Sequence, residues 1–273
     1  MIVTNQVDAS KSFMTKEKIM NQLKQNGVKE GMTIIVHSSL SSLGWVCGGE
    51  VAVVKALKET ISKSGTIVMP TQTTDNSDPC NWENPAVPKE WWEDIRQNMP
   101  AYDPVTTPSY GMGKIVENFR VHPDVVRSSH PTVSFAAWGK HAEEITSNHS
   151  LDFPFGEHSP LARLYERESY VLLLGVDYDS CTAMHLAENR LPHTLSFTKG
   201  TAMFENGKRV WREFFDIDGD SDRFPEIAKG FELEYGIQSF QIGDAKCRLV
   251  PVKELVDFTY RWFEQEVEMF DDK

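Results

Sequence analysis

Short apolar runs alternate with amphipathic segments along this chain of 273 residues. The runs at 31–37, 65–70 and 171–176 are bounded by turn residues and predict buried strands. Segments 15–27 and 51–61 repeat apolar residues at helical spacing and predict helices that bury one face, which in the second helix is Val51, Val54, Leu57 and Ile61. The order strand, loop, helix, strand favours a parallel crossover unit, so we expect an α/β fold.

The later part of the chain continues this alternation. Short helices are predicted at 114–119, 142–147 and 159–165. Asn206 and Gly207 separate two alternating runs and favour a β-hairpin with a type I′ turn. Beyond the hairpin we expect a helix at 224–235, a strand at 242–250, and a final helix at 252–269 that buries Leu255, Phe258, Trp262 and Phe263.

Residues 71–108 differ from the rest because they are rich in proline and contain Trp82, Trp91 and Trp92. A loop of this length in a compact domain often forms a lid or a binding loop. The tryptophans supply apolar surface with which the segment can dock on the body. We therefore expect one domain over residues 1–273, with an insertion at 71–108 that covers part of a cleft.

Candidate chemistry follows the predicted strand at 171–176. Asp177, Asp179 and Ser180 are good N-cap residues, so we expect a helix to begin there and to continue through Glu188. On that helix Thr182, His185 and Glu188 fall at steps of three and share one face. Ligands of open α/β sheets bind just past the ends of such strands.

This row of side chains suits proton transfer. An imidazole has a reference pKa of about 6.5 and can take and return a proton at cellular pH. The carboxylate of Glu188 can orient the ring of His185, and the hydroxyl of Thr182 can donate to a developing oxyanion. An ordinary surface helix with a His/Glu pair is the alternative, because this spacing is common.

A second candidate region is the loop of small residues at 38–44, which is followed by Gly48 and Gly49. Small residues let a ligand approach the backbone, and the next helix start can attract an anion. The loop lacks the ending of a Walker loop and the GxGxxG spacing of a dinucleotide site. Arg127 and His130 flank serines and could meet a phosphate group. The alternative for 38–44 is a tight connection that needs small residues. The alternative for the second segment is that Arg127 caps a helix end and His130 makes a local hydrogen bond.

Composition narrows the function classes. With 40% hydrophobic and 25% charged residues the chain has an ordinary soluble composition. A net charge of −12 argues against a nucleic-acid partner and is compatible with a cationic small substrate, although solubility alone also explains it. No apolar run approaches the roughly 20 residues needed to span a membrane, and residues 1–6 do not resemble a signal peptide, so we expect a cytoplasmic protein without a membrane partner.

Metal binding is not expected from the sequence. The four cysteines are widely spaced and form no CxxC pair, which favours reduced thiols over a zinc site. Cys181 and His185 stand four residues apart but supply only two ligands. The alternating acidic residues at 216–222 fail the EF-hand pattern and indicate either a solvated turn or an acidic rim that faces a cation.

Several motifs, in this order, resemble one known family. They are 36–44 with Gly48-Gly49, Thr107-Pro108 with Met112-Gly113, 127–131 with 134–139, the helix start at 159–161, 172–175, and His185-Leu-Ala-Glu188. Together they resemble the aminoglycoside 3-N-acetyltransferase family, also called the antibiotic N-acetyltransferase family, and within it the YokD-like members. The resemblance spans nearly the whole chain. It implies a three-layer α/β/α fold with a mixed central sheet, unrelated to the GNAT acetyltransferases.

The resemblance also implies transfer of an acetyl group from acetyl-CoA, as co-substrate, to an amine, which in the known enzymes is the 3-amine of a 2-deoxystreptamine antibiotic. The family's helix motif falls on Thr182, His185 and Glu188. Residues expected at the CoA site are His37, Ser38, Ser39, Leu40, Ser41, Ser42, Thr107, Ser109, Tyr110 and Arg127. Residues 177–181 and 71–108 depart from the family pattern, so the acceptor amine stays open. The sequence also leaves open whether the protein forms a homo-oligomer. A hydrolase that uses His185 and Glu188, and a non-catalytic protein that binds CoA or an amino sugar, are the alternatives.

Overall fold

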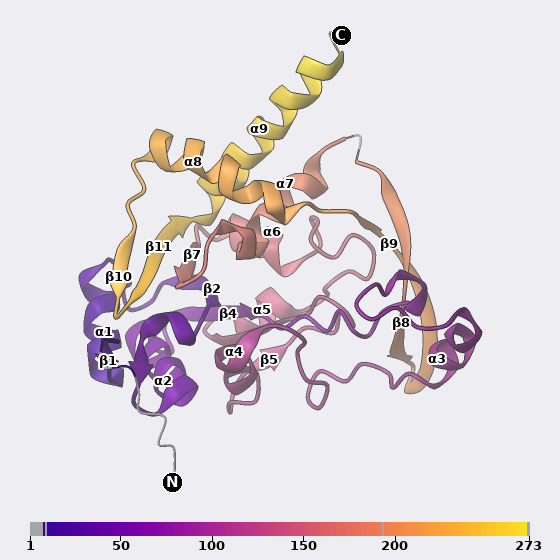
Figure 1. The fold of residues 1–273 in the computed structure, drawn as a ribbon, viewed down its shortest axis with the longest axis horizontal. Helices are drawn as coiled ribbons and strands as arrows, with labels where there is room; N and C mark the ends of the chain where they lie inside the picture. Colours follow the sequence, from indigo (N-terminus) through magenta and orange to yellow (C-terminus); the bar gives the residue numbers. More distant parts are fainter. Residues whose placement is uncertain (1–7, 9, 193, 272–273) are drawn as a thin grey trace.

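A seven-stranded mixed sheet forms the centre of the computed structural model, which describes residue 8 and residues 10–192 and 194–271 (Figure 1). Segment 1–6, where we expect no signal peptide, lies outside the described residues. The strand order is β10-β11-β7-β2-β4-β6-β5. The strands are β2 Thr33–Ser38, β4 Thr66–Pro70, β5 Val126–Arg127, β6 Phe135–Gly139, β7 Tyr170–Leu174, β10 Phe240–Ile242 and β11 Ala245–Pro251.

Helices cover both faces of this sheet, so the three-layer α/β/α expectation is confirmed. One core packs beneath α1 Lys16–Gln25, α2 Gly49–Ile61 and α4 Gly113–Arg120. The other lies beneath α5 Ala142–Thr146, α6 Pro160–Glu166, α7 His185–Arg190, α8 Phe224–Tyr235 and α9 Val252–Asp271. Side chains alternate along each strand, and therefore Ile34 and Val36 of β2 enter the first core while Ile35 enters the second.

The three middle strands carry the topology that matters for a site. β2 pairs in parallel with both β4 and β7, which confirms the predicted parallel crossover. The carboxyl ends of these strands therefore meet at one edge of the sheet. The two-residue strands β1 Phe13–Met14 and β3 Trp45–Val46 form a small separate sheet beside this region.

Three local predictions were wrong. Val51, expected on the buried face of α2, is 39% exposed. The buried face lies further around the helix and includes Ala52 and Val53 along with Val54. The predicted strand at 242–250 is two strands, β10 and β11, joined by a turn in which Gly243 has a φ of 58°. A Cβ there would lie 2.3 Å from the carbonyl oxygen of Leu43, which makes glycine necessary at this turn.

The third error concerns residues 177–188, which do not form one helix. Two single turns of 3₁₀ helix, Tyr178–Ser180 and Thr182–Met184, precede the short helix α7. Cys181 separates the two turns with φ −81° and ψ 83°, outside the helical region. The N-cap at Asp177 forms as expected, since its side chain accepts the N–H of Tyr178 at 2.9 Å.

The hairpin around Asn206 and Gly207 is confirmed. Strands β8 Ser196–Glu205 and β9 Lys208–Ile217 pair in antiparallel fashion, and both turn residues have positive φ. Segment 71–108 contains α3 Trp92–Asn98 and contacts both the body of the fold, where the N–H of Thr71 donates to the carbonyl of Ser134, and this hairpin. The N–H of Tyr102 donates to the carbonyl of Ala202 at 3.0 Å, and the guanidinium of Arg209 donates to the carbonyl of Met99 at 3.1 Å.

The tryptophans of this segment dock unequally. The Nε1 atoms of Trp82 and Trp92 donate to Ser77 and Val87 of the same segment, whereas Trp91 is 57% exposed. Within the described ranges, no helix is both long and apolar enough to cross a membrane.

Candidate active site

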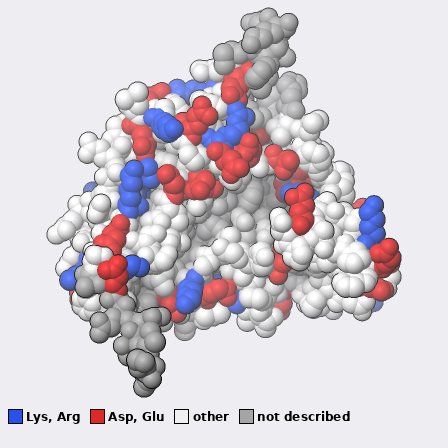
Figure 2. Space-filling model, in the orientation of Figure 1, with Lys and Arg blue, Asp and Glu red and all other residues white. Residues whose placement is uncertain are grey.

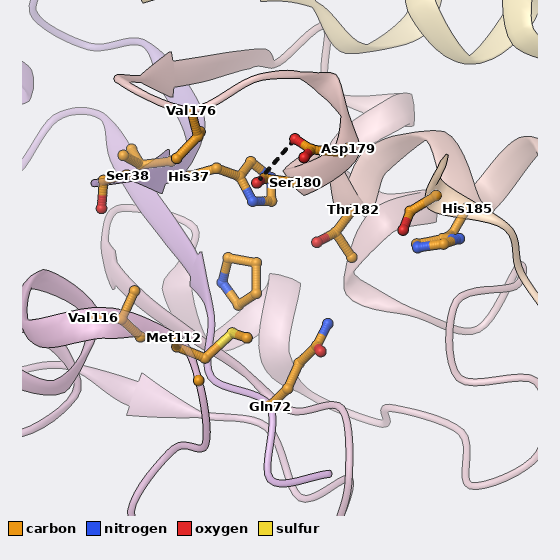
Figure 3. Close-up of a pocket in the computed structure, with 14 residues that line it drawn as sticks. His37, Ser38, Gln72, Met112, Val116, Val176, Asp179, Ser180, Thr182 and His185 are labelled. Carbon is orange, nitrogen blue, oxygen red and sulfur yellow. Dashed lines mark hydrogen bonds between the residues drawn. The ribbon is translucent and has the colours of Figure 1, made fainter. Parts of the chain in front are cut away.

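A hollow of about 340 Å³ opens at the carboxyl ends of β2, β4 and β7 (Figure 3). We call it the first hollow. Each of the three strand ends contributes to its wall, through His37 and Ser38, Pro70 and Gln72, and Val176. The remaining lining residues are Val36, Gly111, Met112, Val116, Asp179, Ser180, Thr182, His185 and Ser221. The sheet topology therefore places residues from distant parts of the chain around one cavity, where ligands of such folds bind.

His185, which lines this hollow, is paired with Glu188. The Nδ1 atom of His185 lies 2.5 Å from Oε2 of Glu188, and only 8% of the Glu188 side chain is exposed. The other oxygen of Glu188 accepts the N–H of Asp220 at 2.9 Å. Because Nδ1 faces the carboxylate, Nε2 of His185 is the ring nitrogen left for a ligand.

Two aromatic rings hold the imidazole of His185 in place. The ring of Phe155 stacks on it with centroids 5.2 Å apart and an interplanar angle of 9°. Phe224 meets it edge-on at 4.9 Å. Packing on the face and on the edge, together with the bond to Glu188, leaves the ring little freedom to rotate.

Thr182 reaches the first hollow despite the broken helix. It begins the second 3₁₀ turn, is 6% exposed, and lines the cavity together with His185. In Figure 3 its side chain is drawn between those of His37 and His185. The structure thus brings Thr182, His185 and Glu188 together as the spacing predicted, on a 3₁₀ turn and the short helix α7 in place of one long helix.

A second hollow of about 540 Å³ adjoins the first and shares Ser38, Gly111 and Met112 with it. The predicted residues Ser39, Leu40 and Ser41 line this second hollow, along with Trp45, Gly49 and Lys114. Gly49 is the first residue of α2, whose free N–H groups favour negative charge. Ser42 lies behind the wall, where its hydroxyl donates to Oγ of Ser39 at 2.9 Å.

His37 lies deep in the first hollow. It is 7% exposed, and burial, aided by the charge of His185, lowers its pKa to about 3. This imidazole is neutral at any physiological pH. Its Nε2 atom is buried, with no hydrogen-bond partner among the residues that the structure describes.

Arg127 is not brought to either hollow. Its Nε donates to the hydroxyls of Thr71 and Ser134 at 3.0 Å each. Its terminal nitrogens donate to the carbonyl oxygens of Thr71 at 2.6 Å and Thr107 at 2.5 Å. The guanidinium therefore links the loops that contain Thr71 and Thr107 through hydrogen bonds, and it does not cap a helix end. His130 makes the local bonds of the alternative interpretation, since its Nδ1 accepts the N–H groups of Thr132 and Val133.

Three other predicted contacts lie near the hollows without lining them. The side chain of Thr107 accepts the N–H of Asp103, and the N–H of Ser109 donates to Glu117. Tyr110 is 57% exposed, and its N–H donates to the carbonyl of Gln72. The wall in this region is formed instead by the next residues, Gly111 and Met112.

The acidic stretch at 216–222 supports the site through its backbone. Asp216 is buried and pairs with Lys199 at 2.9 Å, and the main chain at Gly219 and Asp220 lies against the His185–Glu188 pair. Across the described ranges, no group of three or more His, Cys, Asp or Glu side chains could hold a metal ion.

Comparison with known proteins agrees with this geometry. The family model for aminoglycoside 3-N-acetyltransferases matches residues 35–264, which contain both hollows. The chain belongs to the aminoglycoside 3-N-acetyltransferase family. The resemblance seen in the sequence motifs is therefore confirmed. The expected enzyme class, an aminoglycoside N3-acetyltransferase, is confirmed with it.

Relatives within the aminoglycoside 3-N-acetyltransferase family match almost end to end. The SPbeta prophage-derived aminoglycoside N(3′)-acetyltransferase-like protein YokD of Bacillus subtilis is 51% identical over 91% of this chain and 92% of its own. Its crystal structure superposes with a TM-score of 0.92, covering 94% of this chain and 96% of that one.

Two further members differ more in sequence. Aminoglycoside N(3)-acetyltransferase IX of Micromonospora chalcea is 31% identical over 93% of this chain and 95% of its own. The structure of AAC-IIIb in a binary complex with CoASH, 28% identical, superposes with a TM-score of 0.83 over 93% of this chain and 98% of that one.

Proposed function

We propose that this protein transfers the acetyl group of acetyl-CoA directly to an amine of an aminoglycoside-type antibiotic or a related cationic amine. The observation that carries the proposal is the His185–Glu188 pair, with Nδ1 and Oε2 2.5 Å apart, whose imidazole lines the first hollow beside the second hollow. An acyl transfer without a covalent enzyme intermediate needs two substrates held side by side with a base between them. AAC-IIIb, a relative of similar fold, has been solved with CoASH.

In this mechanism His185 is the general base. The amine reacts in its neutral form, after its ammonium has lost one proton to solvent. As the nitrogen attacks the thioester carbon, the C–N bond forms, the π electrons move to oxygen, and Nε2 of His185 takes a second proton from the nitrogen. Glu188 stabilises the resulting imidazolium through Nδ1. The hydroxyl of Thr182 donates to the oxyanion. When the oxyanion collapses, the C–S bond breaks, the thiolate leaves, and the imidazolium returns its proton to sulfur.

The second hollow would hold the CoA arm. Its wall offers small side chains at Ser38, Ser39 and Ser41, which allow close approach to the backbone. The start of α2 at Gly49 and the ammonium of Lys114 provide positive charge for phosphate groups. The thioester would then reach the first hollow across the shared residues Ser38 and Met112.

The acceptor would bind in the first hollow. Asp179 supplies a carboxylate on its wall, and a net charge of −12 attracts polycations from solution. On the face drawn in Figure 2, acidic and basic side chains are interspersed among the described residues, without the continuous basic surface that nucleic acids require. We place the reaction in the cytoplasm, because acetyl-CoA is available there.

The deciding experiment is thiol release from acetyl-CoA across a panel of aminoglycosides, with the native chain and His185→Ala. Binding of acetyl-CoA is measured in parallel by calorimetry. We expect His185→Ala to lose on the order of 10²–10⁴-fold in turnover and to bind acetyl-CoA normally, since acid–base help has that magnitude. His158→Ala, a change at an exposed histidine, should leave turnover unchanged.

Three results would contradict this function. Turnover by His185→Ala close to that of the native chain would remove the base from the mechanism. Thiol release that does not depend on any amine would indicate a hydrolase. Binding of acetyl-CoA without thiol release in the presence of every amine would indicate a non-catalytic CoA-binding protein.

A further inference from the structure

His37 has a hydrogen-bonding capacity that the folded chain does not satisfy. It is 7% exposed, and its Nε2 atom is buried without a hydrogen-bond partner among the described residues. A buried polar atom that lacks a partner destabilises the fold by roughly 1–3 kcal/mol, and native proteins keep few of them. A bound ligand that supplies the missing partner explains why such an atom is retained.

The position of His37 on β2 directs its ring toward the reacting groups. Side chains alternate along the strand, so His37 lies on the same side of the sheet as Ile35. The core on that side also contains Met184 and Leu186, which are neighbours of His185 in the sequence. The ring lines the first hollow together with Thr182 and His185 (Figure 3). Its neighbour Ser38 lies on the boundary with the second hollow.

Two imidazoles in this cavity differ in their partners. His185 is paired with Glu188 and suited to carry a proton. His37 has no carboxylate partner in the described part of the chain, and burial lowers its pKa to about 3. A neutral imidazole still carries one N–H donor. Two titratable groups of the same kind that lie in such different environments take different roles in catalysis.

We propose that His37 is a further catalytic residue, which donates a hydrogen bond from its neutral imidazole to the carbonyl oxygen of the acetyl group as that oxygen becomes an oxyanion. This role rests on the proposed acetyl transfer and adds a second donor to Thr182. No proton changes hands: the electron pair of the C=O bond moves to oxygen when the amine adds and returns when the C–S bond breaks. Nε2 is closed off from the cavity in the ring orientation of this structure, so the proposed donation requires the ring to rotate about the Cβ–Cγ bond, a torsion with a broad energy well in histidine.

The test compares His37→Phe with His37→Gln. Phenylalanine keeps the ring's bulk and removes both nitrogens, whereas the amide of glutamine keeps an N–H donor. We expect kcat of His37→Phe to fall about 10²–10³-fold, as it does when one oxyanion donor is removed, with an unchanged dissociation constant for acetyl-CoA. His37→Gln should recover at least tenfold of this loss.

Thermal unfolding separates this role from a structural one. The melting temperature of His37→Phe should equal or exceed that of the native chain, because an unpaired buried polar group is removed. His149→Phe is the matched control: His149 is also 7% exposed, but its ring nitrogens lie 3.0 Å from Oγ of Ser128 and 2.7 Å from the carbonyl of Pro154. That variant should melt at a lower temperature and keep kcat.

Either of two results overturns the role of His37. One is a kcat of His37→Phe within threefold of the native value. The other is a His37→Gln variant no more active than His37→Phe. An inactive native chain would overturn the proposed function along with this one, whereas an active native chain with an active His37→Phe variant would overturn only the role of His37.

Discussion

Gly219 lies so close to His185 that a Cβ atom on the glycine would stand 2.8 Å from Nδ1 of the imidazole. The same Cβ would stand 2.8 Å from Oε2 of Glu188. The N–H of the following residue, Asp220, holds the other oxygen of Glu188 at 2.9 Å. The backbone after β9 therefore packs directly against the hydrogen bond between imidazole and carboxylate, and glycine is needed there for its lack of a side chain.

We expect Gly219→Ala to lower kcat at least tenfold, because the added methyl group must displace either the imidazole or the carboxylate from its position. The exposed neighbouring change Asp218→Ala should leave kcat unchanged. Steady-state kinetics and a melting curve for both variants provide the measurement. A fully active Gly219→Ala chain would show that the loop moves away from the pair without consequence.

The carboxylate of Glu188 should matter through its charge. Glu188→Gln keeps the size of the side chain and an oxygen for the N–H of Asp220, but it cannot stabilise the imidazolium of His185. We expect kcat to fall on the order of 10²–10⁴-fold, with little change in KM for acetyl-CoA. Kinetics with saturating acetyl-CoA test this, and a loss confined to KM would assign Glu188 to binding.

Arg127 should contribute to stability and not to CoA binding. Arg127→Met leaves the carbonyl oxygen of Thr107 without its donor, whereas that of Thr71 keeps the hydroxyl of Ser134 at 2.8 Å, so we expect the free energy of unfolding to fall by about 1–3 kcal/mol. Its KM for acetyl-CoA should stay at the native value. Lys114→Ala should show the reverse, a raised KM with unchanged stability. Urea titration and initial rates distinguish the two. A raised KM in Arg127→Met would restore Arg127 to the cofactor site.

Buried histidines should make the fold sensitive to mild acid. The pKa is lowered to about 3 for His37 and about 4 for His149, and well below its ordinary value for His130, in each case chiefly by burial. Between pH 6.5 and 4 the unfolded chain therefore binds protons that the folded chain does not. Stability is fully present above pH 6.5 and declines as the pH falls toward these values, by up to about 1.4 kcal/mol per pH unit for each residue.

Urea titrations between pH 7 and pH 5 measure this slope. Because His149→Phe removes one of these groups, its stability should decline less steeply with falling pH than that of the native chain. Identical slopes in the two proteins would mean that His149 carries no such linkage.

Prediction from sequence worked where the signal is local. The apolar runs of β2, β4 and β7 marked the central strands, and a spacing of three kept Thr182, His185 and Glu188 together because all three follow the break at Cys181. A turn of 3₁₀ helix also repeats every three residues, which is why the row survived.

The rest of the site depends on contacts between distant parts of the chain. Phe155 stacks on His185 from 30 positions earlier in the sequence, and Asp220 contacts Glu188 from 32 positions later. Arg127 was assigned to phosphate because a charged residue among serines resembles an anion site. The loop carbonyl oxygens that accept hydrogen bonds from its guanidinium are brought near it only by folding, so the sequence alone does not reveal them.

The shared wall at Ser38, Gly111 and Met112 has a consequence for inhibitor design. Because the two cavities adjoin there, one molecule that joins a pantetheine-like arm to an amino-sugar head would occupy both at once. The tether turns the second contact into an intramolecular event, so such a bisubstrate compound would bind far more tightly than either half alone.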